Sequence, residues 1–428
     1  MAGLSHIRRI RVAYTTLPGC SHAPRRGAVP CPADNRQVND LDTRAGPARP
    51  GLLRRAAPAL LGYAAVRALG LLVLALWSAA RGTSPYTLLT ARWDALWYTR
   101  VAELGYGYEV RLPNGDVHSN LAFFPLLPWL ERLVAAVSPL SYADGGFLVS
   151  VLASLAAAGG IFAVAERLYG PRAGVCAVLL WAALPVGIVQ SMAYSESLFT
   201  ALAAWSLYAV LTGRWVAAGL LAACAGLTRP VGLAVVAAVW AAGLAALLRK
   251  RRADPADRSP PRGRAAVLLG MAVAPLGAAG YVLWVGHRTG GGPLGYLDVQ
   301  AGWRNGFDGG YAFARFTAEK FTAPATVPAG LALVVGVGLL VWLYGVCVRQ
   351  RQPLGLLVYA GAVTVLALCA SSYFGSKPRL LLPAFPLLLP LALGLARLRT
   401  PRSAAVLGTL AVASAVYGAF WLNGSGPP

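Results

Sequence analysis

Charged side chains are scarce in this sequence. Only 13% of its 428 residues are Asp, Glu, Lys or Arg, whereas a soluble domain carries roughly a quarter. Acidic residues are the scarcer sign, with 16 against 38 basic ones. The mean hydropathy is +0.58, and long uncharged runs recur along most of the chain. The scarcity of charge excludes an ordinary soluble protein and indicates one whose solvent is a lipid bilayer.

Patterns typical of metal sites and disulfides are also missing. The six cysteines form no CxxC pair, and four of them lie in apolar runs, where a thiol behaves as a small hydrophobic group. The four histidines are scattered, and no DxD motif lies outside the N-terminal tail, where Asp40-Leu41-Asp42 matches that pattern. We therefore expect no metal site and no resident cofactor.

The net charge of +22 is compatible with nucleic-acid binding, but the basic residues do not form a patch. They lie in the N-terminal tail and in short loops between apolar runs, where they orient membrane helices and contact anionic lipids. We expect membrane lipids as partners and no nucleic acid.

The tail, residues 1–55, contains ten arginines and many Pro and Gly residues, without apolar periodicity. This composition predicts a disordered cytoplasmic tail. No apolar stretch precedes a small-residue cleavage site near Met1, so we expect no cleavable signal peptide. Residues 56–428 are predicted to form one transmembrane domain.

Eleven apolar runs follow the tail, and most have the length that an α-helix needs to cross the hydrocarbon core. The sequence predicts an all-α, polytopic membrane protein with about eleven transmembrane helices. The expected spans are 58–80, 146–167, 173–192, 197–212, 215–228, 231–248, 265–286, 326–348, 354–371, 380–396 and 403–422.

The loop charges predict an orientation. With the tail in the cytoplasm, alternation places the strongest basic loops, including the 249–264 loop with seven Lys and Arg residues, on the same side. Two long loops, 81–145 and 287–325, then lie outside. Together with the short turn near Glu196, the outer face holds ten of the sixteen acidic residues, which suggests where chemistry occurs.

The first outer loop begins with the string ARWDALWYTR at Ala91. Its apolar residues (Trp93, Leu96, Trp97, Val101 and Leu104) recur at helical spacing, which predicts an amphipathic helix in the membrane interface. Such a helix would hold Asp94 at the lipid–water boundary. The structural alternative is that Asp94 pairs with Arg92 or caps a helix.

A second unit, NLAFFPLLPW, begins at Asn120. Its two prolines break the backbone ladder, so we expect a re-entrant or interfacial helix rather than a spanning one. The alternative is simple packing against the first helix.

These two strings, ARWDALWYTRVAELGYGYE and NLAFFPLLP, resemble the first outer loop of the PIG-V mannosyltransferase family. A third string, AYSESLF from Ala193, is similar to a later motif of that family. The sequence departs from the family pattern by ten inserted residues, Val110 to Ser119, and by its late SKPR string before LLLPAFPLLLP, which looks like that of bacterial GT-C enzymes. Both departures leave the acceptor open.

The resemblance implies a GT-C fold and transfer of a sugar, most simply mannose, from a polyprenyl-phosphate donor at the outer face. It implies an inverting reaction with Asp94 as the general base that deprotonates the acceptor hydroxyl. The acceptor would be a lipid or a glycan. The residues expected to bind substrate in the matched motifs are Arg92, Trp93, Trp97, Tyr98, Asn120, Phe124 and Glu196.

The leaving lipid phosphate calls for cations at the outer boundary. Arg229, Lys377 and Arg379 are the candidates for this contact, and snorkelling at helix ends is the alternative for each. Glu196 would orient an acceptor hydroxyl or hold Arg229, or else cap the helix that begins near Ser197.

Trp303 and its polar neighbours in the second outer loop suit sugar binding, but their spacing is unspecific and favours loop packing. These residues are Gln300, Trp303, Arg304 and Asp308.

Two other classes stay open. A transporter or flippase of lipid-linked substrates is disfavoured because no inverted repeat is visible and the acidic residues lie in loops rather than at mid-membrane. A membrane scaffold without activity would have no need of Asp94. The Ala-, Gly-, Arg- and Leu-rich composition points to a GC-rich genome, hence to a bacterial plasma membrane and to an acceptor other than a GPI precursor.

Overall fold

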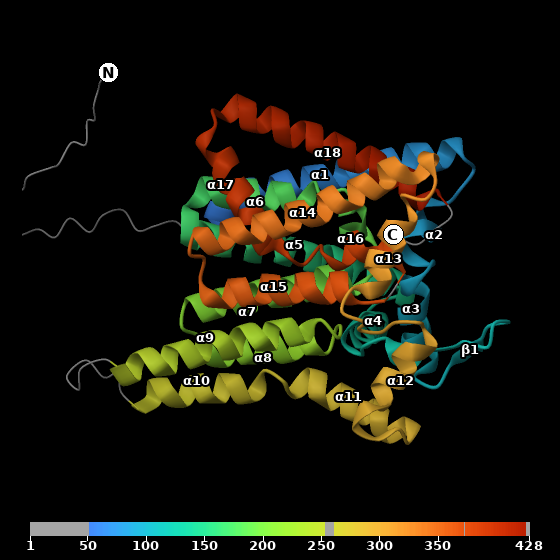
Figure 1. Ribbon diagram of the computed structural model, residues 1–428, viewed down its shortest axis with the longest axis horizontal. Helices are drawn as coiled ribbons and strands as arrows, with labels where there is room; N and C mark the ends of the chain where they lie inside the picture. The colour runs from blue at the N-terminus through green and yellow to red at the C-terminus, as the bar shows by residue number, and fades with distance from the viewer. Residues whose placement is uncertain (1–50, 253–260, 372, 425–428) are drawn as a thin grey trace, which may run out of the picture. The chain divides into compact units, whose positions relative to one another are not determined.

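The computed structural model describes residues 51–252, 261–371 and 373–424 (Figure 1). Most of the predicted N-terminal tail and the centre of the 249–264 loop lie outside the described residues. The described chain is almost entirely helical, which confirms the predicted all-α fold class. Its β-structure is one antiparallel hairpin of two three-residue strands, β1 (Glu109–Arg111) and β2 (Val117–Ser119), in the described parts of the chain.

Within these residues, six helices are long and apolar enough to cross a membrane, and a bent pair would make a seventh span. Four shorter apolar helices accompany them, so the predicted number of eleven spans stays a prediction. The six long segments are Leu52–Ala80, Tyr142–Tyr169, Gly232–Arg249, Gly263–Thr289, Pro324–Arg349 and Thr400–Leu422. The four shorter helices are Pro171–Ala182, Ser195–Leu211, Trp215–Gly226 and Leu354–Cys369.

The helices of these spans, the shorter apolar helices and one helix of the bent pair are labelled in chain order. They are α1 (Leu52–Ala80), α5 (Tyr142–Tyr169), α6 (Pro171–Ala182), α7 (Ser195–Leu211), α8 (Trp215–Gly226), α9 (Gly232–Arg252), α10 (Pro261–Val273), α11 (Leu276–Thr289), α14 (Val327–Arg349), α15 (Leu354–Cys369), α17 (Leu389–Arg397) and α18 (Thr400–Leu422). Their apolar side chains form the core on facing surfaces, and large apolar residues on the remaining surfaces are exposed, as expected of helices that face lipid.

Two of the runs predicted as continuous spans are broken, and here the prediction was wrong. The 173–192 run is α6 followed by the 3₁₀ turn η2 (Gly187–Ser191), and the 380–396 run belongs to a pair of helical segments bent by 73°. The predicted 265–286 run lies within one candidate span, Gly263–Thr289, which contains α10 and α11. Proline accounts for the break at Pro383 and for the junction of α10 and α11 at Pro275, because it removes a backbone donor and clashes with the preceding turn.

The pieces of that bent pair are η6 (Phe374–Ser376), α16 (Lys377–Leu380), η7 (Phe385–Leu388) and α17. Breaks of this kind leave backbone groups unpaired at membrane depth, so other side chains have to satisfy them.

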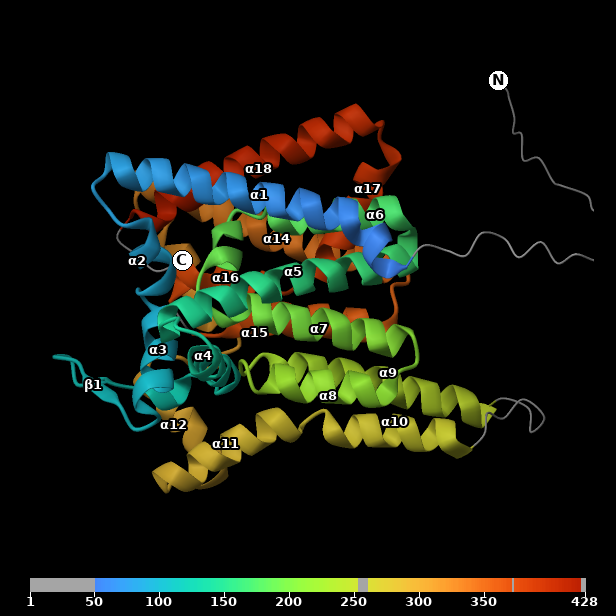
Figure 2. The same cartoon turned by 180° about the vertical axis from the view of Figure 1, so that it is seen from behind.

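Both predicted outer loops consist of short elements gathered at one end of the helices, opposite the end at which α9 stops (Figures 1 and 2). The first loop contains α2 (Pro85–Thr90), α3 (Asp94–Leu104), the hairpin, η1 (Asn120–Ala122) and α4 (Leu126–Val137). The second contains η4 (Gly292–Leu294), α12 (Gly295–Gly302), α13 (Tyr311–Glu319) and η5 (Pro324–Thr326).

The helix predicted from the ARWDALWYTR string is present as α3, but its buried face differs from the predicted stripe. Ala95, Tyr98 and Val101 are buried, whereas Leu104 is 62% exposed. Trp93 precedes the helix rather than lying within it. The helix packs against α4 and α5, and of the predicted stripe only Val101 is buried. The position of the helix in the membrane interface stays a prediction.

A line of glycines joins α8 to α10 and α11. A Cβ atom on Gly219 would overlap the carbonyl oxygen of Gly270, and one on Gly277 would overlap that of Ala223. On α8, a Cβ at Gly226 would lie 2.7 Å from the backbone nitrogen of Ala278. The helices therefore meet backbone to backbone, as small residues allow in membrane proteins.

Candidate active site

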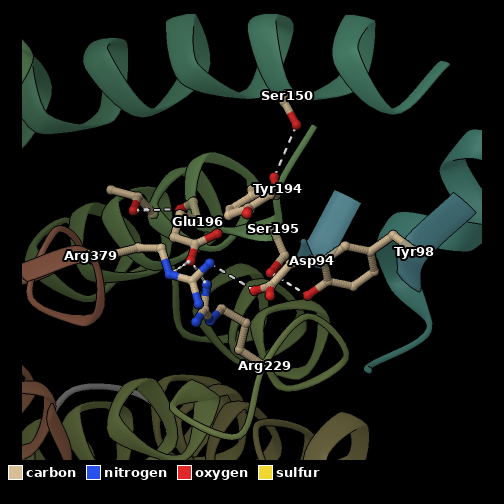
Figure 3. Close-up of polar contacts among 9 residues, drawn as sticks. Asp94, Tyr98, Ser150, Tyr194, Ser195, Glu196, Arg229 and Arg379 are labelled. Atoms are coloured by element: carbon tan, nitrogen blue, oxygen red, sulfur yellow. Dashed lines mark hydrogen bonds and ion pairs between the residues drawn. The ribbon is translucent and has the colours of Figure 1, made fainter. Parts of the chain in front are cut away.

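Asp94 is the first residue of α3 and enters that helix through a strained turn. The preceding residue, Trp93, has a φ of 53°, in the left-handed region that a bulky side chain rarely adopts. Such strain persists only where the surrounding structure enforces it, and it recurs at functional sites. Here it directs the Asp94 carboxylate toward α16 and the start of α7 (Figure 3).

Asp94 belongs to a cluster of four charged side chains that come from four separate parts of the chain. The Nη1 of Arg379, on α16, donates to Oδ2 of Asp94 over 2.8 Å, and its Nε lies 3.3 Å from Oε1 of Glu196. Glu196, in the first turn of α7, also pairs with Arg229, which precedes α9. Figure 3 shows Arg379 between the two carboxylates. We call Asp94, Glu196, Arg229 and Arg379 the charge cluster.

The cluster contains two positive and two negative groups, so it is formally neutral. Its members differ in burial: the Glu196 side chain is 1% exposed, those of Arg379 and Arg229 are 10% and 13%, and that of Asp94 is 28%. Buried charges persist only when they are paired, which accounts for the interior three. Asp94 is the member that a ligand arriving from solvent would meet first.

The Tyr194–Ser195 pair, which the sequence analysis did not single out, forms the wall beside the cluster. The guanidinium carbon of Arg379 lies 5.1 Å from the centre of the Tyr194 ring, and the hydroxyls of Ser195 and Tyr98 are 2.7 Å apart. Burial raises the pKa of the Tyr98 phenol, so it stays neutral near pH 7. Asp94 is the exposed charged group beside this wall.

Arg67, in the middle of α1, holds the irregular segment that leads to Glu196. It is only 9% exposed and donates to the carbonyl oxygens of Ala182 and Gly187, at the end of α6 and the start of η2. From there Ser197 of α7 donates to the carbonyl of Gln190 over 3.2 Å. The sequence analysis missed Arg67, although a lone charge inside an apolar run was the signal for it.

Several residues predicted to bind substrate have structural contacts, and their role in substrate binding stays a prediction. Arg92 is exposed and lies over the Trp93 ring, 4.5 Å from its centre, so the alternative in which it pairs with Asp94 is not what the structure shows. Trp97 stacks on Phe123 and meets Trp303 edge to face, at centroid distances of 5.6 and 4.9 Å.

Asn120 and Phe124 lie in the interior of the outer elements. Asn120 is fully buried and accepts from the Gly107 amide while donating to the Gly105 carbonyl. Phe124 packs on the Tyr281 ring, 4.4 Å between centroids. Both therefore stabilise the loop rather than line the charge cluster.

Lys377 lies two residues from Arg379 but outside the cluster. Its Nζ donates to the carbonyls of Ala367 and Ala370 at 2.8 and 2.7 Å, at the end of α15. It also lies over the ring of Phe313, 5.0 Å from its centre. Lys377 thus caps a helix end, and Arg379 and Arg229 remain as the cations beside Asp94.

The second outer loop shows the packing that its unspecific spacing predicted. Trp303 donates to the Ser119 carbonyl over 3.0 Å and Arg304 pairs with Asp116. Asp308 accepts from backbone amides at the start of α13. The inserted residues 110–119 form the hairpin, and these contacts fasten it to the second loop.

Glu131, on α4, is a buried carboxyl outside the cluster. It is 0% exposed, and neither oxygen has a hydrogen-bond partner among the described residues. It packs against Gly146 of α5, where a Cβ atom would lie 2.6 Å from Oε1 and 3.4 Å from the Ala193 side chain. Burial without a partner raises the pKa of the Glu131 carboxyl well above its usual range.

The fold and the cluster together define a polytopic helical membrane protein with a charged site at one end of its helices. Its fold is similar to that of the solved structure of ArnT from Cupriavidus metallidurans bound to undecaprenyl phosphate, with a TM-score of 0.50 at 18% sequence identity. The match covers 82% of this chain and 62% of that one.

In sequence, residues 120–276 match the family model of dolichyl-phosphate-mannose-protein mannosyltransferases. Curated relatives include GPI alpha-1,6-mannosyltransferase 2 of Mus musculus, 35% identical over 156 residues, and that of Rattus norvegicus, 33% identical. These matches cover about a third of this chain and only 29% and 30% of the relatives' own length. They confirm the predicted resemblance to mannosyltransferases.

Proposed function

We propose that the protein is a glycosyltransferase that moves a sugar, most simply mannose, from a polyprenyl-phosphate donor to a lipid or glycan acceptor. The observation that carries the proposal is the charge cluster, in which the most exposed carboxylate, Asp94, lies 2.8 Å from an arginine. A base and a phosphate-binding cation next to each other are what this reaction requires. The names of the mouse and rat relatives and the lipid phosphate bound to ArnT support it.

In the proposed reaction, the acceptor hydroxyl oxygen attacks the anomeric carbon while the bond between that carbon and the phosphate oxygen breaks. The acceptor proton passes to Asp94, and the electron pair leaves with the phosphate. Attack from the face opposite the leaving group inverts the anomeric configuration. Arg379 is placed to meet the charge that develops on the phosphate, since a guanidinium matches its oxygens in geometry.

The remaining members of the cluster have supporting roles in this proposal. Glu196 holds Arg379 and Arg229 in place, and Arg229 balances the second negative charge. No resident cofactor takes part, because arginines supply the positive charge that a metal would otherwise bring. We place the reaction at the outer face of a bacterial plasma membrane, with the N-terminus in the cytoplasm.

Substitution of the base tests the proposal. In Asp94→Asn the carboxylate becomes an amide of the same size, which cannot accept the proton, so transfer falls by about 10²–10⁴-fold. The measurement is transfer of radiolabelled mannose from polyprenyl-phosphate-mannose in membranes containing the full chain. Glu103→Gln, an exposed carboxyl-to-amide change on the same helix, is the control and keeps wild-type transfer.

Wild-type transfer in Asp94→Asn would rule out the assigned base.

Addition of a chelator tests the cofactor proposal, which expects unchanged transfer. The orientation is tested by a single cysteine at position 94, which should react with an impermeant thiol reagent from the outer side of intact cells.

A further inference from the structure

Arg379 is the cation of the charge cluster that contacts two carboxylates, those of Asp94 and Glu196. Its Nε side faces Glu196, and its Nη1 donates to Asp94. Glu196 is 1% exposed and is also paired with Arg229, so this contact is enclosed on every side by charge and packing. Asp94, in contrast, is the exposed end of the cluster. Of the two contacts of Arg379, the one to Asp94 is therefore the one that a ligand can replace.

Oδ2 of Asp94 accepts a hydrogen bond from Nη1 of Arg379, so this oxygen already has a donor in the place that an acceptor hydroxyl would take. For an acceptor hydroxyl to donate to this oxygen, Arg379 has to direct its Nη1 elsewhere. A phosphate is the natural competitor, since it binds a guanidinium with the same two-oxygen geometry as a carboxylate.

We infer that the phosphate of the lipid donor takes Nη1 of Arg379 away from Asp94, and that donor binding thereby frees Oδ2 of Asp94 to receive the acceptor hydroxyl. Glu196 keeps the Nε side of Arg379 fixed, so the guanidinium changes partner without leaving the site. The inference rests on the proposed function and adds a regulation to it: Asp94 and the phosphate compete for one arginine. Acceptor activation then follows donor binding, which limits the chance that a bound acceptor is deprotonated without a donor.

A double-mutant cycle on binding tests this competition without any turnover. The probe is undecaprenyl monophosphate, titrated against the purified full chain in nanodiscs, with the dissociation constant as readout. The variants are Asp94→Asn, Arg379→Gln and the two combined. Glu103→Gln reports what the loss of one negative charge on α3 does at longer range.

Because Asp94→Asn removes the competitor, it should bind the lipid phosphate about tenfold more tightly than wild type, the size of a typical coupling between two sites. Arg379→Gln should bind it about tenfold more weakly. In the Arg379→Gln background the gain from Asp94→Asn should vanish, because no shared arginine remains. Glu103→Gln should leave the affinity unchanged.

Two results of this double-mutant cycle would overturn the inference. One is an unchanged affinity in Asp94→Asn. The other is a gain that persists in full in the Arg379→Gln background, which would mean that Asp94 only repels the phosphate. Should the asparagine variant misfold, Asp94→Ala in the same two backgrounds gives the same comparison.

Inorganic phosphate, titrated in parallel, distinguishes a free anion from the lipid headgroup. A gain in Asp94→Asn for inorganic phosphate but not for the lipid would assign the cluster to another ligand and overturn the inference. The transfer assay keeps the two proposals apart. If Asp94→Asn abolishes transfer but does not bind the lipid more tightly, the proposed function stands and only the competition fails.

Discussion

Two pairs of buried cations in this protein differ in what they bind. Arg67 and Lys377 donate to backbone carbonyls at helix ends, whereas Arg229 and Arg379 pair with carboxylates. A carbonyl belongs to the backbone and offers a fixed partner. A carboxylate on a partly exposed side chain can be replaced by another anion as the partner of the same cation.

The contrast is sharpest between Lys377 and Arg379, which lie two residues apart on the same short helix. Lys377 points to the end of α15 and Arg379 to the cluster. Sequence position alone does not separate them, but the chemistry of their partners does. Cations on carbonyls stabilise the broken helices, and cations on carboxylates are the ones for which we propose a chemical role.

Removal of Arg67 should give the largest effect on stability. Arg67→Met leaves the carbonyls of Ala182 and Gly187 without their donor, and loss of hydrogen bonds to a charged group costs about 3 kcal/mol in the free energy of unfolding. Thermal unfolding in detergent measures the loss. Arg54→Met, at an exposed position of the same helix, is the control. If both variants melt together with wild type, Arg67 does not hold the break.

The next comparison sets Lys377→Met against Arg379→Lys. The first should lower the melting temperature while turnover per folded molecule stays within about twofold. The second keeps a positive charge but loses the planar fork, so turnover should fall about tenfold with little change in melting. Transfer assays and thermal unfolding on both variants check this. If Lys377→Met lowered turnover and Arg379→Lys lowered the melting temperature, the distinction between carbonyl-bound and carboxylate-bound cations would be wrong.

Glu131 differs from both pairs of cations, because its buried carboxyl group has no hydrogen-bond partner among the described residues. Its raised pKa means that the folded protein binds this proton more tightly than the unfolded chain does. The favourable contribution is complete below the unfolded pKa and is lost as the pH rises from there toward the folded pKa. Glu131→Gln removes that loss, so it should melt a few degrees above wild type at pH 8 and together with it at pH 4.

Melting curves at the two pH values provide the measurement for Glu131, and Glu103→Gln, at an exposed site, should show no such difference. An equal shift at both pH values would mean that packing, rather than the proton, is responsible.

The sequence predicted the apolar runs, the two long loops and the residues that make up the charge cluster. Asp94, Glu196, Arg229 and Arg379 were all among its candidates. Motif resemblance identified the first two, and position at the ends of apolar runs identified the arginines. Their mutual contacts depend on the starts of α3 and α7, the short helix α16 and the turn before α9 meeting in space, which no local pattern encodes.

The sequence could not predict the helix breaks or the role of Arg67. Hydropathy sums the polarity of side chains and is insensitive to where the backbone hydrogen bonds are interrupted, so the run 173–192 looked continuous. Asn120 and Phe124 lay in a matched motif, yet they pack inside the loop. A matched motif contains residues that pack and residues that we propose for chemistry, and only their contacts in the structure distinguish the two.

The glycines between α8 and the α10–α11 pair have a mechanical consequence. Because backbone touches backbone at Gly219 and Gly277, α8 cannot rotate or slide past α10 or α11 without a steric clash. The three helices should therefore move as one rigid unit, or rod, during turnover. Any adjustment of the second outer loop to a bulky acceptor then has to arise beyond the rod, at the glycine-rich corner that begins at Gly290, which has a φ of 72°.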